Sequence, residues 1–179
     1  MQTVKMVVTG PFNAGKTAFI RTVSEIDVVS TEKKISQDAE RVKDTTTVAM
    51  DFGRITIDED LILYLFGTPG QRRFDFMWEI LSEGMLGFIV MIDSCRPETF
   101  REARSILETF RAYAPTPYIV AANKQDKADA WELDDMRIAL RLDSRVKLLP
   151  CVATDKESVK NILLQLLYQI LEEMESNLS

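Results

Sequence analysis

One loop motif constrains this chain more than any other feature of its sequence. Residues 10–17 read Gly-Pro-Phe-Asn-Ala-Gly-Lys-Thr, the pattern G-x-x-x-x-G-K-T. A loop of this kind surrounds phosphate groups with backbone N–H groups, between a buried strand and the N-terminus of a helix. The apolar, β-branched run 4–9 precedes it, and apolar residues at helical spacing follow it over 18–23. The sequence therefore predicts a phosphate-binding loop between a strand and a helix.

The positions of the motif have distinct physical roles. Gly10 and Gly15 let the backbone turn and come close to the phosphates. The Lys16 ammonium can reach the terminal phosphates, and the Thr17 hydroxyl can bind Mg²⁺. We expect the nucleotide contacts of this loop to come from Gly10, Asn13, Ala14, Gly15, Lys16, Thr17 and Ala18.

Composition narrows the class of protein. The chain has 179 residues, of which 46% are hydrophobic, and we expect a single domain over residues 1–179. It has no histidine, which excludes histidine-dependent catalytic triads, and its two cysteines are far apart. A net charge of −6 argues against nucleic acid as a partner. With no apolar run of membrane-spanning length, no signal peptide and no prenylation cysteine, we expect a cytoplasmic protein without a lipid anchor.

Strands and helices alternate along the chain, which is typical of a parallel sheet covered on both faces. We expect an α/β fold with a mixed, mostly parallel six-stranded sheet, whose loops at the carboxyl ends of the strands hold the ligand. The strands are predicted at 4–9, 48–57, 61–66, 87–92, 118–122 and 147–152. Helices are predicted after the phosphate-binding loop and at 74–82, 98–113, 133–140 and 157–174.

The segment 27–47 is polar and has no apolar period. A loop of this length in a compact domain is usually functional or disordered. We expect a mobile segment that closes over the nucleotide, with an insertion of no function as the alternative. It ends at three consecutive threonines, 45–47.

The second decisive motif is Asn123-Lys124-Gln125-Asp126, directly after a predicted strand. Here the chain resembles the Ras-like small GTPases, over nearly its whole length. In that family N-K-x-D recognises guanine, which implies that Asp126 accepts hydrogen bonds from guanine N1–H and N2–H₂. The resemblance also implies that Asn123 braces the loops around the base and that Lys124 lies across the ring. Adenine lacks those donors and would leave the carboxylate unpaired, which is costly.

Residues 151–157 resemble the family's S-A-K loop in an altered form. Ala153 aligns with the alanine whose backbone N–H contacts guanine O6, and Thr154 stands where lysine is usual. The resemblance therefore adds Ala153 and Thr154 to the expected nucleotide contacts. A plain strand-to-helix connection is the alternative.

The loop 67–71 reads Gly-Thr-Pro-Gly-Gln and is similar to the family's D-x-A-G-Q switch. The resemblance implies that Gly70 offers its N–H to the γ-phosphate and that Gln71 orients the attacking water, with Lys16 as the other catalytic residue. Gly67 departs from the pattern, because the family has there an aspartate that supports Mg²⁺. Asp51 and Asp93 are the two carboxylates that could replace it, and the sequence does not choose between them.

The run 47–52 is similar to the T-I-G-V-D-F segment of Rab-like GTPases. This alignment makes Thr47 a nucleotide contact and, with Thr17, a ligand of Mg²⁺, and Thr46 is the alternative. Three strand-entry threonines without a ligand role are also possible.

Two further features bear on catalysis. Phe12 is bulky where many family members have glycine, so it could obstruct the γ-phosphate and slow hydrolysis, or simply pack on the switch loops. Three arginines, Arg54, Arg72 and Arg73, could stabilise transition-state charge from within the chain. Solvated arginines are the other interpretation.

The resemblance implies a GTP-binding molecular switch that hydrolyses GTP to GDP slowly unless a partner helps, with switch loops around 27–47 and 67–77. The expected ligands are GTP or GDP and Mg²⁺, and the expected partners are a protein effector and a GTPase-activating protein. The missing aspartate and the absent lipidation cysteine look most like the prokaryotic MglA or Rup-type branch, which implies a Roadblock/LC7-type regulator. The alternatives are an interaction module that binds nucleotide with negligible turnover and a P-loop ATPase or kinase.

Overall fold

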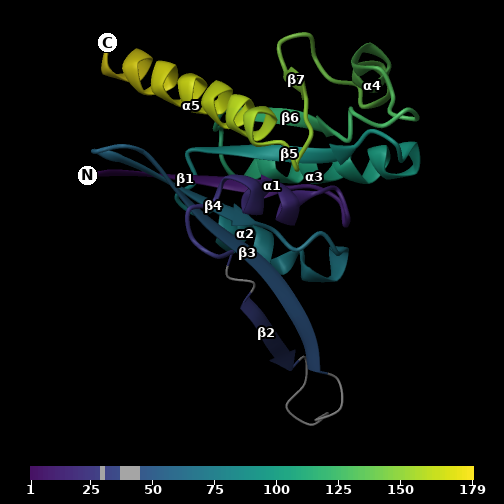
Figure 1. Cartoon of the computed structure of the whole chain (residues 1–179), viewed down its shortest axis with the longest axis horizontal. Helices are drawn as coiled ribbons and strands as arrows, with labels where there is room; N and C mark the ends of the chain where they lie inside the picture. The colour runs from purple at the N-terminus through teal and green to yellow at the C-terminus, as the bar shows by residue number, and fades with distance from the viewer. Residues whose placement is uncertain (29–30, 37–44) are drawn as a thin grey trace.

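A computed structural model describes the backbone of residues 1–28, 31–36 and 45–179, and the side chains of 1–28 and 50–179. Seven strands form one sheet in the order β2-β3-β4-β1-β5-β6-β7 (Figure 1). The strands are β1 (Gln2–Thr9), β2 (Thr31–Ser36), β3 (Thr45–Asp58), β4 (Leu61–Gly67), β5 (Gly87–Asp93), β6 (Tyr118–Asn123) and β7 (Lys147–Pro150).

Helices cover both faces of this sheet. They are α1 (Lys16–Val23), α2 (Phe76–Ser82), α3 (Phe100–Tyr113), α4 (Leu133–Ala139) and α5 (Lys156–Leu178), with 3₁₀ turns η1 (Arg72–Phe74) and η2 (Pro97–Thr99). One apolar core lies under α1 and α5, and the other lies under α2, α3 and α4. None of the helices in the described ranges has the length and apolar content of a membrane span.

The centre of the sheet is parallel, and the helices that connect its strands bury them on both faces. Strand β1 lies between β4 and β5, and β5, β6 and β7 continue in parallel. Every residue of β5 is buried, as expected for a strand with helices above and below it. Only β3 and β2 run antiparallel to their neighbours. The predicted α/β fold with a mixed, mostly parallel sheet and helices on both faces is confirmed.

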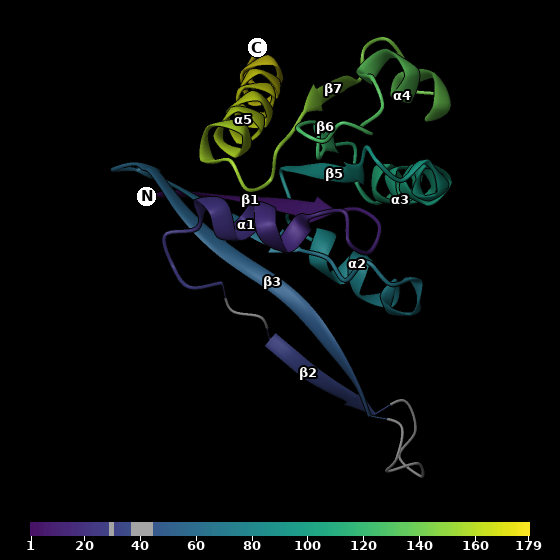
Figure 2. The same ribbon diagram turned by 45° about the vertical axis from the view of Figure 1, so that its right-hand side comes forward.

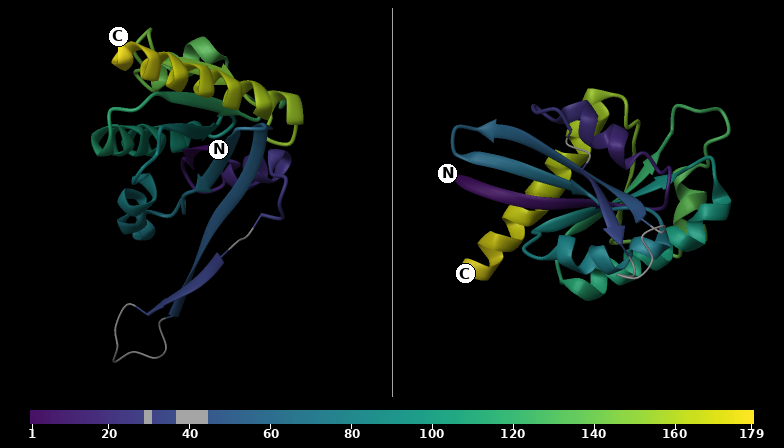
Figure 3. Two further views of the ribbon diagram at one scale, coloured as in Figure 1. Left: turned by 90° about the vertical axis from the view of Figure 1, so that its left-hand side faces the viewer. Right: turned by 90° about the horizontal axis from the view of Figure 1, so that it is seen from below.

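The edge of the sheet differs from the prediction. The segment 27–47, expected to be a mobile loop, contains strand β2, and strand β3 begins at Thr45, three residues earlier than expected. β2 pairs antiparallel with the first part of β3, from Thr31 opposite Met50 to Ser36 opposite Thr45. This two-stranded ribbon extends away from the helices (Figures 2 and 3). Apolar patterning missed strand β2 because backbone hydrogen bonds alone can define such a strand. Residues 29–30 and 37–44 of the predicted loop lie outside the described residues.

Candidate functional site

The predicted phosphate-binding loop joins β1 to α1 in a conformation that needs its glycines. Gly10 and Gly15 have φ of 143° and 104°, and Asn13 has φ of 65°. A Cβ on Gly10 would overlap the backbone carbonyl of Met91 in β5, so a larger residue cannot pack there. Gly15 also precedes the first turn of α1. The amides of that turn lack partners within the helix, which suits an anion.

Lys16 is buried at the base of this loop, where its ammonium donates to two backbone carbonyls. The Nζ lies 2.6 Å from the Gly10 oxygen and 2.8 Å from the Pro11 oxygen. Burial lowers the pKa of Lys16 to about 8, although the charges of Asp51 and Glu102 raise it in part. The two carbonyls therefore hold a cation that its surroundings do not fully stabilise, and an anionic ligand would supply the missing charge.

Asn123 joins three loops that are far apart in the sequence. Its Nδ2 donates to the Ala14 carbonyl at 2.9 Å, and its Oδ1 accepts from the Ala153 N–H at 3.0 Å. Only 3% of Asn123 is exposed, so both bonds are shielded from water. The bracing role implied for Asn123 thus has a geometric basis, because its one carboxamide connects the phosphate-binding loop, the end of β6 and the loop before α5.

The other three residues of the N-K-x-D motif, Lys124, Gln125 and Asp126, differ in the polar contacts that their side chains make. Lys124, with φ of 64°, donates from Nζ to Asp93 Oδ2 at 2.7 Å. Gln125 Nε2 donates to Ser94 Oγ at 2.8 Å and to the Trp131 carbonyl at 3.1 Å. The Asp126 side chain is 47% exposed and lies 3.9 Å from Lys127 Nζ. Its carboxylate is therefore accessible to a ligand, while its neighbours fix the loop.

Ala153 lies close to this motif, but its N–H has another partner than the one the resemblance implied. That N–H donates to Asn123 Oδ1 at 3.0 Å. The next residue, Thr154, lines the cavity beside the phosphate-binding loop. Ala153 and Thr154 both stay predicted contacts of the base.

A cavity of about 760 Å³ lies over the phosphate-binding loop, a volume suited to a nucleotide. Predicted residues supply most of its walls, but Arg21, Thr22, Thr68 and Pro69 were not predicted as site residues. Arg21 lies one helical turn after Thr17 on α1, and this i, i+4 spacing was the signal available in the sequence. The cavity is lined by Phe12, Asn13, Ala14, Gly15, Lys16, Thr17, Ala18, Arg21, Thr22, Asp51, Thr68, Pro69, Gly70 and Thr154.

The loop after β4 closes one side of this cavity. Thr68 Oγ1 donates to Thr9 Oγ1 at 2.8 Å, and Trp78 Nε1 donates to the Pro69 carbonyl at 2.9 Å. Gly70 lies so close to the phosphate-binding loop that a Cβ on it would come within 2.7 Å of the Phe12 backbone and of Lys16 Nζ. A glycine is therefore required at the position expected to face the γ-phosphate.

Gln71, the expected water-orienting residue, has its side chain held by a neighbour. Its Oε1 accepts from Arg73 Nε at 2.8 Å, and the Arg73 guanidinium lies over the Phe74 ring. Gln71 does not line the cavity in this structure. The Phe12 side chain, expected near the γ-phosphate, is 58% exposed at the mouth of the cavity.

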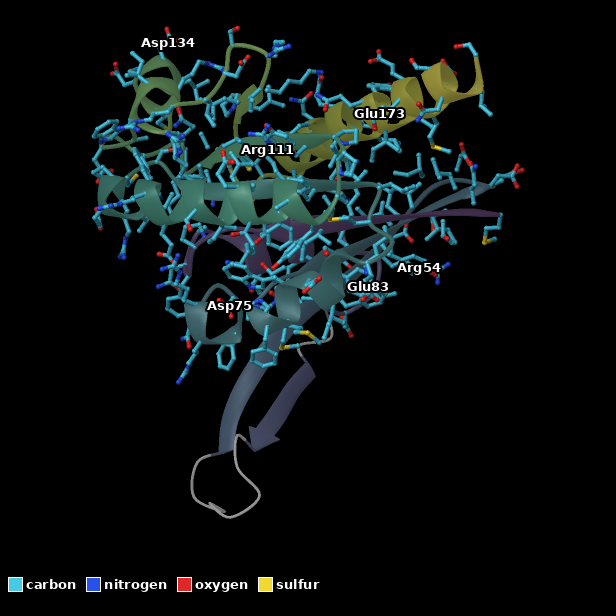
Figure 4. The ribbon with its side chains drawn as sticks, turned by 180° about the vertical axis from the view of Figure 1, so that it is seen from behind. Arg54, Asp75, Glu83, Arg111, Asp134 and Glu173 are labelled. Atoms are coloured by element: carbon cyan, nitrogen blue, oxygen red, sulfur yellow. The ribbon has the colours of Figure 1, made fainter. Side chains whose placement is uncertain are left out.

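None of the three candidate arginines lines this cavity. Arg72 donates to Ser105 Oγ on α3 at 3.1 Å, and Arg73 holds Gln71. Arg54 of β3 pairs with Tyr64 of β4, which pairs in turn with Lys5 of β1. Lys5 is five residues before Gly10, so Arg54 lies roughly 15 Å along the sheet from that loop. In the view of Figure 4, Arg54 lies on the same side of the molecule as Glu83, and Asp75 lies on the other side.

The residues expected to bind Mg²⁺ are described only in part. Thr17 Oγ1 donates to Asp51 Oδ2 at 2.5 Å, which places a carboxylate beside the phosphate-binding loop. Thr47 and its alternative Thr46 are in β3, with side chains outside the described residues. Hydroxyl and carboxylate oxygens are the donors that Mg²⁺ prefers, so this oxygen set is chemically suited to it.

Comparisons with known proteins identify a family and several relatives of this chain. A model of the family described as conserved hypothetical ATP binding protein matches residues 26–173. An uncharacterized protein of Methanocaldococcus jannaschii is 33% identical over 126 residues, which cover 70% of this chain and 73% of that protein. ADP-ribosylation factor-like protein 3 of Saccharomyces cerevisiae is 28% identical over 166 residues, 87% of this chain and 80% of that protein. Human ADP-ribosylation factor-related protein 1 is 28% identical over 137 residues, 75% of this chain and 65% of that protein.

Proposed function

We propose a guanine-nucleotide switch as the function of this chain, on the premise that it belongs to the family of conserved hypothetical ATP-binding proteins. Its similarity to ADP-ribosylation factor-like and factor-related proteins supports membership of the Ras-like GTPase superfamily. They do not support the MglA or Rup-type branch suggested by the sequence, and that assignment is corrected to the superfamily alone. The family description names ATP, so the choice of base has to be argued from the site.

The observation that carries the proposal is the Asn123 carboxamide, which connects the phosphate-binding loop to both loops expected around the base. A base bound there would lie beside Asp126, whose carboxylate is accessible. Guanine offers two N–H donors to such a carboxylate, whereas adenine offers none at the corresponding atoms. A site built to accept those hydrogen bonds can discriminate by about 10⁴-fold or more. We therefore favour GTP and GDP over ATP.

The proposed reaction is hydrolysis of the γ-phosphate by water. The backbone N–H of Gly70 would face the phosphate, Lys16 would stabilise its charge, and Gln71 would orient the water. Catalysis of this kind depends on positioning and electrostatics. Because Gln71 is held by Arg73 outside the cavity, we expect slow turnover until a partner or the nucleotide rearranges this loop.

Mg²⁺ would neutralise charge on the β- and γ-phosphates when bound. Thr17 and Thr47 are the proposed protein ligands, one from the first turn of α1 and one from the ribbon of β2 and β3. The ribbon around 27–47 and the loop 67–77 are the proposed switch regions. A nucleotide that binds one arrangement of these regions more tightly than another shifts their population, which a partner can detect.

Three half-buried aromatic rings on β3 and β4 form a candidate surface for a protein partner. The Phe52 ring packs against the rings of Tyr64 and Phe66. Aromatic side chains of this kind are frequent anchors at interfaces. We propose that an effector and a GTPase-activating partner act near this face, in the cytoplasm, on a single domain of residues 1–179. A Roadblock/LC7-type protein is one activator to test.

Identification of the bound nucleotide tests this function. The purified protein would be denatured and its nucleotide separated, and GTP and ATP would then compete for the reloaded site. We expect bound GDP, a strong preference for GTP and slow hydrolysis with Mg²⁺. In Asp126→Asn, the preference for guanine over adenine should fall by about 10²-fold or more. Bound ADP, or equal competition by ATP, would contradict the proposal and support an ATPase.

A second candidate is an interaction module that binds nucleotide with negligible turnover. Phe12 at the mouth of the cavity and the sequestered Gln71 favour it. The two readings differ in Phe12→Gly. If the ring obstructs catalysis, this variant should hydrolyse GTP faster than the wild type in single-turnover assays. An unchanged or lower rate, together with no turnover in the presence of a partner, would favour the module.

A further inference from the structure

Strand β3 carries a carboxylate, Asp51, directly opposite Gly67 at the end of β4. On the basis of the proposed function, we propose that Asp51 of β3 supplies the carboxylate that holds Mg²⁺ at this site in place of the residue missing at position 67. The carboxylate would thus come from a different strand of the same sheet. Position, hydrogen bonding and charge support this assignment.

The position of Asp51 follows from strand pairing. Asp51 lies directly opposite Gly67 in the antiparallel ladder of β3 and β4. A Cβ on Gly67 would lie 3.1 Å from Asp51 Cβ and 3.5 Å from Asp51 Oδ2. Directly opposed residues on neighbouring strands have Cβ atoms close together, so their side chains occupy adjoining space. The Asp51 carboxylate therefore lies in the region that a side chain at 67 would enter.

The hydrogen bond of Thr17 supports the assignment independently. Thr17 Oγ1 donates its proton to Asp51 Oδ2 at 2.5 Å. A hydroxyl whose proton is engaged in this way directs its lone pairs elsewhere, and both residues line the same cavity. Partners that orient a metal ligand by hydrogen bonding commonly change metal affinity by about 10–100-fold. Asp51 would therefore orient Thr17 and add negative charge beside the cation.

Charge at the site agrees with this role. The Asp51 carboxylate, the Lys16 ammonium and the Thr17 hydroxyl line the same cavity. One negative charge thus lies in the cavity that contains the proposed phosphate-binding lysine and the proposed metal-binding threonine. A divalent cation is the ligand that such a carboxylate would accept next to an anionic nucleotide.

Asp93, the other candidate, is committed to another part of the molecule. Its Oδ2 accepts from Lys124 Nζ at 2.7 Å and its Oδ1 accepts from the Cys95 N–H at 2.9 Å. It does not line the cavity with Thr17. Asp93 therefore supports the N-K-x-D loop, which leaves Asp51 as the carboxylate beside Thr17.

This assignment changes which elements of the protein would be stabilised by metal binding. Asp51 and Thr47 are both in β3, four residues apart. Mg²⁺ would then be held by α1 and β3, and the loop after β4 would contribute through Gly70 and the phosphate alone. Binding of the metal would consequently stabilise the ribbon of β2 and β3 more than the loop 67–71.

The test measures how Mg²⁺ controls release of a fluorescent GDP analogue. In the wild type, Mg²⁺ should slow release with a measurable midpoint. Asp51→Asn keeps the size of the side chain and an oxygen that can accept from Thr17, but it removes the charge. We expect its midpoint to rise by about tenfold or more. Asp60→Asn, on the exposed turn between β3 and β4, is the matched control and should match the wild type.

An exchange of the two facing residues sharpens the test. Gly67→Asp alone would crowd Asp51, whereas Asp51→Gly with Gly67→Asp removes that crowding and leaves a close contact with the flexible end of Ile20. The double variant should recover Mg²⁺ dependence that Asp51→Gly loses. An unchanged midpoint in folded Asp51→Asn would overturn the assignment while leaving the guanine-nucleotide proposal intact. Failure of the wild type to bind the GDP analogue would instead overturn the proposed function.

Discussion

The loops around the proposed base site and the loop after β4 are stabilised in different ways. The base-side loops are joined by Asn123, which is buried and makes two bonds across long sequence separations. The loop after β4 has a buried anchor at Trp78, but its last residue, Gln71, is held by the exposed Arg73. The difference indicates that the base side is preorganised for binding, whereas the end of the other loop can rearrange at low cost.

The largest loss of stability should come from removing the two hydrogen bonds by which Asn123 joins the loops on the base side. Asn123→Ala leaves the Ala14 carbonyl and the Ala153 N–H without their partner in a buried site. We expect a loss of about 2–4 kcal/mol in the free energy of unfolding, measured by urea denaturation. Gln125→Ala, on the same loop but with half-exposed bonds, should lose about 1 kcal/mol or less. Equal losses would show that the carboxamide does not carry the connection.

A second effect depends on pH, through Lys16. Its pKa is about 8 without ligand, and phosphates should raise it because they favour the charged form. Binding would then take up a proton above pH 8, so affinity for GDP should be constant below pH 8 and fall up to about tenfold per unit above it. Calorimetry from pH 7 to 9 in buffers of different ionisation enthalpy measures this uptake. Proton release at pH 8.5 would contradict the expected direction.

The same group affects the stability of the nucleotide-free protein. The Lys16 pKa is lower in the folded than in the unfolded chain, so the unfolded chain binds more protons between about pH 8 and 10.5. Its contribution to stability therefore rises with pH through that window. Bound phosphate should reduce this dependence, which urea titrations with and without GDP would detect.

A smaller loss of stability is expected when the Trp78 hydrogen bond that anchors the loop after β4 is removed. Trp78→Phe removes the N–H that donates to the Pro69 carbonyl and should cost about 1–2 kcal/mol. Hydrogen exchange should become faster at residues 68–71 and stay unchanged at 123–126. Trp131→Phe, at a half-exposed position beside Phe100, is the control. Faster exchange in both loops would mean that they unfold as one unit.

The smallest effect on stability is expected at the end of that loop. Arg73→Ala removes the hydrogen bond to Gln71 at an exposed position, so stability should change by less than about 0.5 kcal/mol. Single-turnover GTP hydrolysis should nevertheless rise severalfold, because Gln71 becomes available. Arg72→Ala, whose partner is Ser105, should leave the rate unchanged. A slower rate in Arg73→Ala would indicate that Arg73 positions Gln71 productively.

The sequence predicted the parts of the molecule that depend on local patterns. The strand, glycine loop and helix around Lys16 are contiguous, and the buried strand before Asn123 is an unbroken apolar run. The proximity of Asp51 to Gly67 was not predictable in the same way, because it depends on the register of two strands joined by a turn. Strand β2 was missed because its residues lack alternation. The bond of Ala153 to Asn123 depends on packing between distant loops.

The ribbon of β2 and β3 also bears on how the protein behaves at high concentration. In the described part of the chain, β2 is the last strand of the sheet and pairs only with β3. An outer strand of this kind offers a template for intermolecular sheet formation, and lysines on such strands are a common protection against aggregation. The sequence of β2 contains Glu32, Lys33 and Lys34. Charged residues in the sequence of an outer strand oppose pairing between molecules, so we expect the protein to resist strand-to-strand association at high concentration.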